Sequence, residues 1–187
     1  MKTLILLAFM LIANVFAGEA QEMFCDDKSL SYCINHFDRQ CEAKNYIACR
    51  IVGELHEEQK QYGKTKKYYE MVCDRANSKD SYELEWIDGE VSEFPAIIGM
   101  KGSCGVLGLF YNNGLGVRQS YEKALQYYKK ACDLGNGNGC GMVGAFYHDG
   151  VVVKQNLSKA KELFGKACDL GEQIGCDNYK KLKEEGY

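Results

Sequence analysis

Apolar residues recur at helical spacing through the C-terminal half of the chain. Leu107, Phe110 and Tyr111 fall on one face of a helix, and this pattern stops at Asn112-Asn113-Gly114. It resumes at steps of three and four residues with Tyr121, Ala124, Tyr127, Tyr128 and Ala131. Such steps indicate amphipathic helices, and an Asn/Gly cluster between them indicates a turn. The pattern predicts a helix, a turn and a second helix.

This unit is repeated. Cys104 to Cys140 and Cys140 to Cys176 each span 36 residues, and about half of the positions agree. The matching pairs include Gly108/Gly144, Phe110/Phe146, Tyr111/Tyr147, Gly114/Gly150, Gln119/Gln155 and Ala124/Ala160. Self-similarity at about 20 to 50 residues indicates a solenoid, in which each repeat buries its apolar face against its neighbours. We therefore predict an all-α, right-handed α/α solenoid with repeats at 104–139 and 140–175.

An earlier, degenerate repeat is expected at 49–73. Gly53 aligns with Gly108, and Tyr68-Tyr69 aligns with Tyr127-Tyr128. This copy is about four residues shorter because it lacks the Gly-Leu-Gly-Val segment of the later turn. We expect a tighter corner between its two helices.

The ends and the middle of the chain depart from the repeat. Residues 25–49 are expected to be N-terminal capping helices, and 176–187 a C-terminal capping helix, because terminal repeats need a polar outer face. Residues 74–103 form an insertion that contains the only tryptophan, Trp86, and the only proline, Pro95. Long connections of this kind are often functional. The apolar residues of the insertion are expected to contact either a partner or the solenoid itself.

The cysteines require the chain to turn back on itself. Most of the ten form pairs eight residues apart. Eight residues of helix would separate two Cα atoms by about 12 Å, whereas a disulfide needs them within about 7 Å. We predict the disulfides Cys25–Cys33, Cys41–Cys49, Cys73–Cys104, Cys132–Cys140 and Cys168–Cys176, with the N-terminal pairings open. Because no pair has the C-x-x-C spacing of zinc sites, we expect no metal and no other cofactor.

The N-terminal segment has the features of an export signal. A charged start is followed by an apolar run from Leu4 to Phe16, with small residues at two candidate cleavage points, after Ala17 or after Ala20. We predict a signal peptide at 1–17, because the run is too short for a good membrane span. The mature protein is then expected to be secreted or periplasmic, without stable membrane insertion and with disulfides formed.

The charge balance disfavours one class of partner. The chain has 23 Lys and Arg against 26 Asp and Glu, a net charge of −3. Nucleic-acid binding needs a basic patch with aromatic side chains between the charges, and the sequence contains none. We expect no nucleic-acid partner, and a monomer.

The segment Leu107–Val117, followed by Lys123-Ala124, Tyr128 and Lys130-Ala131, resembles the Sel1-like repeat, a relative of the tetratricopeptide repeat. Together with the cysteine spacing and the export signal, the chain resembles the secreted Helicobacter cysteine-rich (Hcp) family. That resemblance implies an α/α solenoid. It also implies penicillin binding, with β-lactamase activity as a hydrolase of the cyclic amide, or engagement of host or periplasmic partners.

The sequence does not reveal a catalytic nucleophile for such a hydrolase. Serine β-lactamases use Ser-x-x-Lys, which occurs here as Ser120 to Lys123 and as Ser158 to Lys161. The repeat alignment places Ser120 opposite Asn156, and both residue types are good helix N-caps. We interpret Ser120 as a cap, so the catalytic residues remain unknown.

A binding scaffold is the alternative function. Its concave groove would be lined by the first helix of each repeat and would bind a peptide, a protein or a cell-wall fragment, with β-lactams as further candidates. The predicted groove residues are Tyr111, Asn112, Tyr147 and His148, which recur at the polar end of those helices. Asn both donates and accepts hydrogen bonds, as peptide recognition requires. Turn capping and core packing are the competing role for these four residues, and a purely structural envelope component is a third function.

Overall fold

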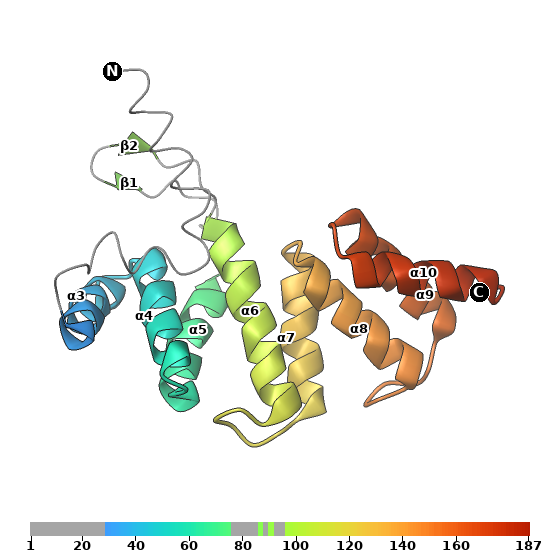
Figure 1. The fold of residues 1–187 in the computed structure, drawn as a ribbon, viewed down its shortest axis with the longest axis horizontal. Coiled ribbons are helices and arrows are strands. Elements are labelled where there is room, and N and C mark those ends of the chain that lie inside the picture. The colour runs from blue at the N-terminus through green and yellow to red at the C-terminus, as the bar shows by residue number, and fades with distance from the viewer. Residues whose placement is uncertain (1–28, 76–85, 88–89, 92–95) are drawn as a thin grey trace.

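The computed structural model describes residues 29–75, 86–87, 90–91 and 96–187 (Figure 1). The predicted signal peptide and Cys25 lie outside these residues. In chain order, the elements are α3 (Leu30–Glu42), α4 (Tyr46–Glu58), α5 (Tyr62–Arg75), β1 (Trp86–Ile87), β2 (Glu90–Val91), α6 (Ala96–Asn113), α7 (Tyr121–Asp133), α8 (Gly137–Asp149), α9 (Leu157–Asp169) and α10 (Gln173–Glu184).

The helices follow one another in a curved row from α3 to α10 (Figure 1). Three successive pairs, α4 with α5, α6 with α7 and α8 with α9, have the closest contacts, and each pair also contacts the next. We call α4, α6 and α8 the first helices and α5, α7 and α9 the second helices. This arrangement confirms the predicted all-α solenoid. Within the described ranges, the only strands are β1 and β2, which pair as a small antiparallel hairpin inside the predicted insertion.

Polar side chains and glycines set the helix ends. Ser120 caps α7 by accepting a hydrogen bond from the Lys123 N–H, and Asn156 caps α9 by accepting from the Lys159 N–H. Gly135 and Gly171, which follow α7 and α9, have φ of +82° and +91°. Glycine adopts this left-handed conformation without steric cost, so the chain can reverse direction within a few residues.

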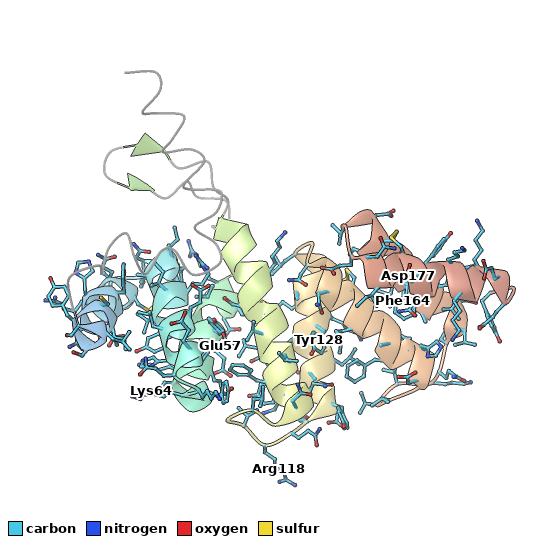
Figure 2. The ribbon with its side chains drawn as sticks, viewed as in Figure 1. Glu57, Lys64, Arg118, Tyr128, Phe164 and Asp177 are labelled. Carbon is cyan, nitrogen blue, oxygen red and sulfur yellow. A yellow bond between two sulfur atoms is a disulfide. The ribbon has the colours of Figure 1, made fainter. Side chains whose placement is uncertain are left out.

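Each first helix contains a glycine that receives an aromatic ring from its second helix. A Cβ added at Gly53, Gly108 or Gly144 would lie 2.5 Å from the Tyr69 ring, 2.6 Å from the Tyr128 ring or 2.8 Å from the Phe164 ring. Tyr128 and Phe164 lie at the contacts between helices in Figure 2. The glycines therefore fix how closely the two helices of each repeat approach.

Disulfides close the corners between repeats. The described pairs, with their Cα–Cα distances, are Cys41–Cys49 at 4.6 Å, Cys73–Cys104 at 5.1 Å, Cys132–Cys140 at 4.5 Å and Cys168–Cys176 at 4.5 Å. These are pairs that the cysteine spacing predicts. They join α3 to α4, and then each second helix to the helix that follows it. No disulfide is found inside a helix pair of the described chain.

Cys33 has a different setting from the corner cysteines. It is disulfide-bonded and buried, but it lies inside α3 rather than at the end of a helix. Its predicted partner, Cys25, is outside the described residues. Cys33 therefore differs from the cysteines of the three corners that have the eight-residue spacing.

The predicted insertion is partly helical. α6 begins at Ala96 and has 18 residues, whereas the corresponding helix α8 has 13. The last residues assigned to the insertion are thus the first turns of α6. Pro95 directly precedes this helix in the sequence, and proline is compatible with a helix start but not with a helix interior.

Candidate functional site

The first helices form the side of the solenoid on which successive repeats approach each other most closely. α4 contacts α6, α6 contacts α8, and α8 contacts α10. Within the described chain, the backbones of α5 and α7, and of α7 and α9, do not approach each other to this extent, and only side chains bridge α5 and α7. In a curved stack the inner elements lie closest together, so the first helices line the inner surface. This is the surface on which the sequence places its candidate binding residues.

The C-terminal end of each later first helix is held by a glutamine from the following loop. Gln119 Nε2 donates to the Asn112 carbonyl at 2.7 Å, and Gln155 Nε2 donates to the His148 carbonyl at 2.7 Å. The same bond thus occurs in both repeats. It fixes the backbone from which the Asn112 and His148 side chains project.

The side chains of Asn112 and His148 are half-buried and bond to the next residue in the sequence. Asn112 Nδ2 donates to Asn113 Oδ1 at 2.9 Å, and His148 Nδ1 lies 2.6 Å from Asp149 Oδ1. The His148 side chain remains 39 % exposed. Both can therefore offer hydrogen-bonding groups to a ligand. Among the described residues, no hydrogen bond links Asn112 to His148.

The predicted groove tyrosines contribute mainly to the core. Tyr111 is 6 % exposed and stacks on Tyr127, with ring centroids 5.5 Å apart. Lys123 covers its ring, with Nζ 5.1 Å from the centroid. Tyr147 is partly buried, and Lys129 Nζ lies 5.8 Å from its ring. Tyr111 therefore packs in the core, which is the competing role, rather than facing a groove.

Sequence reasoning overlooked a third position equivalent to Asn112 and His148. Each of these residues follows the ring-contacting glycine of its helix by four positions, and in α4 the same position is Glu57. Tyr69 donates its hydroxyl proton to Glu57 Oε2 at 2.8 Å. Desolvation, with the nearby Glu57 carboxylate adding to it, raises the pKa of Tyr69. The alignment of Gly53 with Gly108 was the signal that could have identified Glu57.

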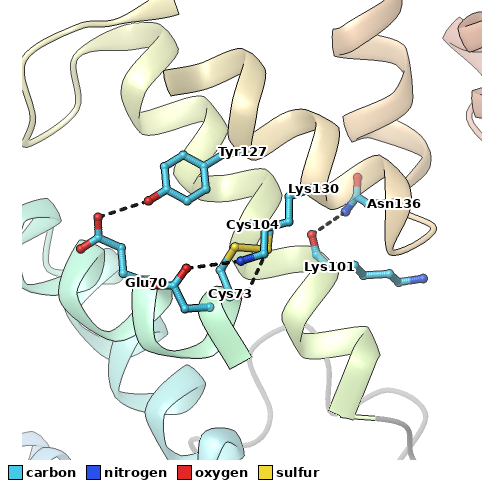
Figure 3. The surroundings of a disulfide bond; sticks show 8 residues. Glu70, Cys73, Lys101, Cys104, Tyr127, Lys130 and Asn136 are labelled. Carbon is cyan, nitrogen blue, oxygen red and sulfur yellow. Dashed lines mark hydrogen bonds and ion pairs between the residues drawn. A yellow bond between two sulfur atoms is a disulfide. The ribbon is translucent and has the colours of Figure 1, made fainter. Parts of the chain in front are cut away.

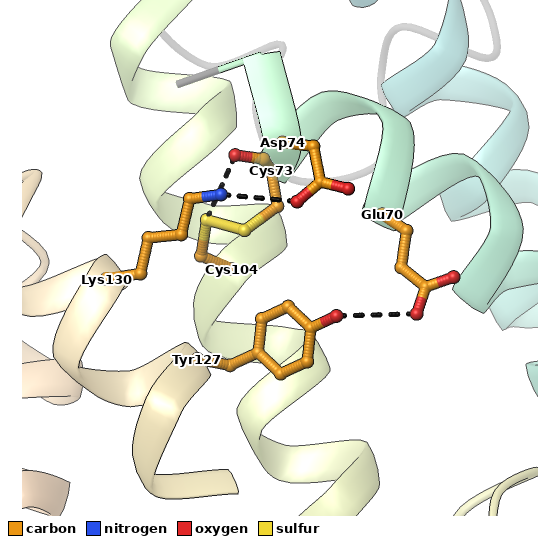
Figure 4. Close-up of polar contacts among 6 residues, drawn as sticks. All are labelled: Glu70, Cys73, Asp74, Cys104, Tyr127 and Lys130. Carbon is orange, nitrogen blue, oxygen red and sulfur yellow. Dashed lines mark hydrogen bonds and ion pairs between the residues drawn. A yellow bond between two sulfur atoms is a disulfide. The ribbon is translucent and has the colours of Figure 1, made fainter. Parts of the chain in front are cut away.

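A second polar cluster lies between α5 and α7, next to the predicted groove residue Tyr111, on which Tyr127 stacks (Figure 4). Tyr127 donates to Glu70 Oε1 at 3.4 Å, and Lys130 Nζ lies 3.3 Å from Asp74 Oδ1. Lys66 also binds Glu70, at 2.9 Å, and this hydrogen bond raises the pKa of Lys66. Desolvation raises the pKa of Tyr127, with the Glu70 carboxylate adding to it. The cluster connects two repeats, and its members lie too far apart in sequence to be predicted from local patterns.

This cluster borders the Cys73–Cys104 disulfide, where the insertion leaves and re-enters the solenoid (Figure 3). On the other side of the disulfide, Asn136 Nδ2 donates to the Lys101 carbonyl at 3.2 Å. The base of the insertion is therefore bonded both covalently and through polar contacts. This leaves the two ends of the insertion in fixed positions.

The structure assigns Ser120 to helix capping. Its hydroxyl accepts from the Lys123 backbone and donates to Glu122 Oε2 at 2.9 Å. The Glu122 backbone N–H and the Ser120 hydroxyl lower the pKa of Glu122. Ser158 is exposed in the first turn of α9. Neither serine is hydrogen-bonded to the lysine side chain of its Ser-x-x-Lys sequence among the contacts of the described residues.

Two further classes of feature are absent from the part of the chain that the structure describes. No group of three or more His, Cys, Asp or Glu side chains is arranged to hold a metal ion. None of the described helices combines the length and hydrophobicity needed to cross a bilayer.

The fold and its corners define a class, the disulfide-linked α/α solenoid built from helix-pair repeats. Residues 103–136 and 138–172 each match the model of the Sel1 repeat. Helicobacter pylori cysteine rich protein B has a similar solved structure, with 28% identity, coverage of 79% of this chain and 92% of that chain, and a TM-score of 0.53. The chain therefore contains two Sel1 repeats, and these findings support the resemblance to cysteine-rich Sel1-like proteins seen in the sequence.

A Sel1 repeat protein from Oxalobacter formigenes shares the fold, with 16% identity, coverage of 79% of this chain and 97% of that chain, and a TM-score of 0.59. A comparison with curated proteins finds no match. The disulfides are typical of proteins outside the reducing cytoplasm.

Proposed function

We propose that this protein is an exported, non-catalytic scaffold that binds an extended peptide or a peptide segment of another protein on its inner surface. Solenoid repeats generally create extended concave surfaces that bind partners. The observation that carries this proposal is the repeated corner, where Gln119 and Gln155 fix the backbones of Asn112 and His148. Side chains held on fixed backbones lose less conformational entropy when they bind.

Peptide recognition matches the chemistry of these side chains. The Asn112 amide can both donate to and accept from a peptide bond, and the His148 imidazole offers one further donor or acceptor. The Asn112 and His148 side chains can each exchange the neighbouring partner, Asn113 or Asp149, for a peptide group without disturbing the core. Glu57, at the equivalent position of α4, extends the same row across a third repeat.

The test is binding of an immobilised peptide array of varied sequence by the oxidised protein. Replacing both Asn112 and His148 with alanine should weaken binding to any captured peptide by about tenfold for each lost hydrogen-bonding side chain. Asn138→Ala is the matched control, because Asn138 is an exposed asparagine at the opposite end of α8. Equal affinities of the double variant and the wild type would contradict the proposed site.

Weak β-lactam binding or hydrolysis is the second proposal, and the Hcp resemblance together with the two Ser-x-x-Lys sequences supports it. Nitrocefin turnover and intact-mass detection of an acyl adduct test it. Ser120→Asn removes the hydroxyl but keeps a cap of the kind that Asn156 provides, and Ser158→Ala removes an exposed hydroxyl. An adduct that persists in both variants would exclude these serines, and no turnover or adduct in the wild type would exclude the activity.

Export rests on the segment 1–17. We propose that it is cleaved and that the mature protein is secreted or periplasmic. The intact mass of protein recovered outside the cytoplasm would identify the cleavage site, and recovery of only the uncleaved chain would contradict the proposal.

A further inference from the structure

His56 is a buried histidine in the middle of the N-terminal part of the solenoid. The residue is 5 % exposed, and its Nδ1 is buried without a hydrogen-bond partner among the described residues. The Oε1 atom of Gln61, in the next corner, is also buried and without a partner. The Gln61 backbone N–H donates to the His56 carbonyl at 2.9 Å, so the two residues are neighbours. The Gln61 side chain nonetheless lies close enough to act on the His56 ring as a long hydrogen-bond partner, which raises the pKa of His56 against the effect of burial.

The imidazole contacts a residue of α5 that is hydrogen-bonded to α3. It stacks on Tyr68 of α5, with ring centroids 5.7 Å apart and planes 22° from parallel. The Tyr68 hydroxyl then donates to Asp38 Oδ1 of α3 at 2.8 Å. A displacement of the His56 ring would therefore move the residue that holds Asp38.

The charges around His56 come from each helix packed against it. α5 contributes the Lys64 ammonium, and α3 contributes the Asp38 carboxylate. Burial lowers the pKa of His56, Lys64 lowers it further, and Gln61 and Asp38 act in the opposite direction. The ring is thus neutral at pH 7. Tyr68 keeps its proton, since desolvation and the acids Asp38 and Glu42 raise its pKa to about 12.

Protonation of His56 disfavours the closed arrangement. It places a positive charge in a buried aromatic stack, near the Lys64 ammonium. An opened state exposes the ring to water, where its pKa returns to about 6.5. The pKa of His56 is lower in the closed state than in the opened state. The free-energy preference for the closed state is therefore full above about pH 6.5 and decreases as the pH falls below that value.

Two disulfides confine the opening to this region. Cys41–Cys49 keeps α3 attached to α4, and Cys73–Cys104 keeps α5 attached to α6. α3 can separate from α5 without leaving the molecule. When His56 loses its proton, the tethered helix is in place to return.

We propose that α3, α4 and α5 form an acid-responsive unit, in which protonation of His56 releases α3 from α5 while α6–α10 remain folded. This regulation goes beyond the proposed binding function and does not depend on it. In an acidic compartment, release of α3 would change the N-terminal surface next to Glu57, Asn112 and His148.

The experiment measures amide hydrogen exchange of the oxidised, full-length mature protein at pH 7.5 and pH 5.0, corrected for the intrinsic exchange rate at each pH. Protection in α3 and α5 should fall at the lower pH, with α6–α9 unchanged, because protonation of His56 favours the opened state. His56→Phe keeps an aromatic ring in the stack but does not titrate, so it should remove this fall. His36→Gln and His148→Gln are the controls, because the other two histidines of the chain are more exposed and should leave the response intact.

Any one of three results would overturn the proposal. The first is a fall in protection that persists in His56→Phe, which would assign the response to the carboxylates. The second is an equal loss of protection across α6–α9. The third, measured by NMR on the wild type, is an ordinary histidine pKa for the His56 ring, which decides the question even if the phenylalanine variant does not fold.

Discussion

A single residue in the α8–α9 loop has an unfavourable backbone conformation. Val152 has φ of +52°, in the left-handed region that β-branched residues avoid. The aligned residue in the preceding repeat is Gly116, with φ of +63°. A Cβ at Gly116 would lie 2.9 Å from the Gly63 backbone nitrogen, so glycine is required there by contact as well as by conformation. Val152 is 43 % exposed.

We therefore expect Val152→Gly to stabilise the protein. Removing the left-handed strain of a β-branched residue gains about 1 to 2 kcal/mol, and the greater freedom of glycine in the unfolded chain offsets part of this. The net gain should be about 0.5 to 1 kcal/mol, measured as a higher urea midpoint of the oxidised protein. Gly116→Val is the reciprocal variant and should be clearly destabilising. An unchanged or lower midpoint for Val152→Gly would contradict the strain argument.

At the residue scale, the sequence anticipates what depends on local chemistry. Ser120 could be assigned to capping because the aligned residue is Asn156, another good cap. The backbone strain at Val152 could not be anticipated, because valine is a residue that normally indicates a strand or a helix. The buried environment of His56 also depends on packing between separate helices. Tyr111 was placed in the groove because it recurs, as Tyr147, at the polar end of the first helices, although its ring is buried against Tyr127.

At the scale of the elements, the four described corner disulfides are not equally protected. The sulfur-bearing residues at Cys132–Cys140 are 3 % and 0 % exposed, and those at Cys41–Cys49 and Cys73–Cys104 are no more than 2 % exposed. Cys168 and Cys176 are only half-buried, because α10 is the last helix and nothing covers this corner within the described chain. Thiol attack on a disulfide depends on access to the sulfur atoms.

Partial reduction should therefore open Cys168–Cys176 first. Cys132–Cys140 is the matched comparison, since it has the same sequence separation and the same Cα–Cα distance of 4.5 Å. Limited dithiothreitol treatment, followed by alkylation and peptide mass analysis, measures the order. Labelling of Cys132 at the same rate as Cys168 would show that burial does not control reactivity here.

The helices of the two later repeats were predictable because the unit is repeated, apolar residues recur at helical spacing in α7 and Asn or Gly residues mark the turns between helices. The start of α6 was not, since the repeat alignment places the first residue of the unit near Cys104 and gives no information about extra turns before it. The small hairpin of β1 and β2 is likewise outside the repeat pattern. Both departures occur where the chain has no second copy of itself for comparison.

For the whole molecule, the insertion is an addition to a corner that is already complete. Cys73–Cys104 holds α5 and α6 with nearly the same Cα separation as Cys132–Cys140, 5.1 Å against 4.5 Å. The segment between the latter pair, Asp133–Gly139, is therefore a suitable replacement for residues 74–103. It also begins with aspartate, so the ion pair of Lys130 can form again.

We expect this shortened chain to fold with the same solenoid and the same disulfide at this corner. Because the disulfide also closes this loop in the unfolded oxidised chain, shortening the loop should change the free energy of unfolding by less than about 1 kcal/mol. Circular dichroism measures the helix content, and peptide mapping identifies the disulfides. Failure of Cys73 to pair with Cys104, or a loss of helix beyond the extra turns of α6, would show that the insertion supports the fold.

The last helix, α10, departs from the repeat at one position. In each repeat, a glycine of the first helix receives the ring of the second helix, but the aligned position in α10 is Lys180. Its side chain is 77 % exposed and lies 3.9 Å from Glu184. A charged side chain at this position would obstruct an aromatic ring packed against it, so α10 lacks the glycine that receives a ring in the other repeats.

The corner disulfides also determine how the protein would respond to a mechanical pull on its two ends. Tension would pass through each sulfur bridge rather than through the chain between its cysteines, so the corners could not lengthen. Only the segments between bridges could extend, at about 3.3 to 3.6 Å per residue. Cys73 and Cys104 are 31 residues apart, and the segment between them would bear no tension because their disulfide would bear it instead. A partner held by the insertion would thus stay attached to an unstretched segment while the repeats around it unravelled.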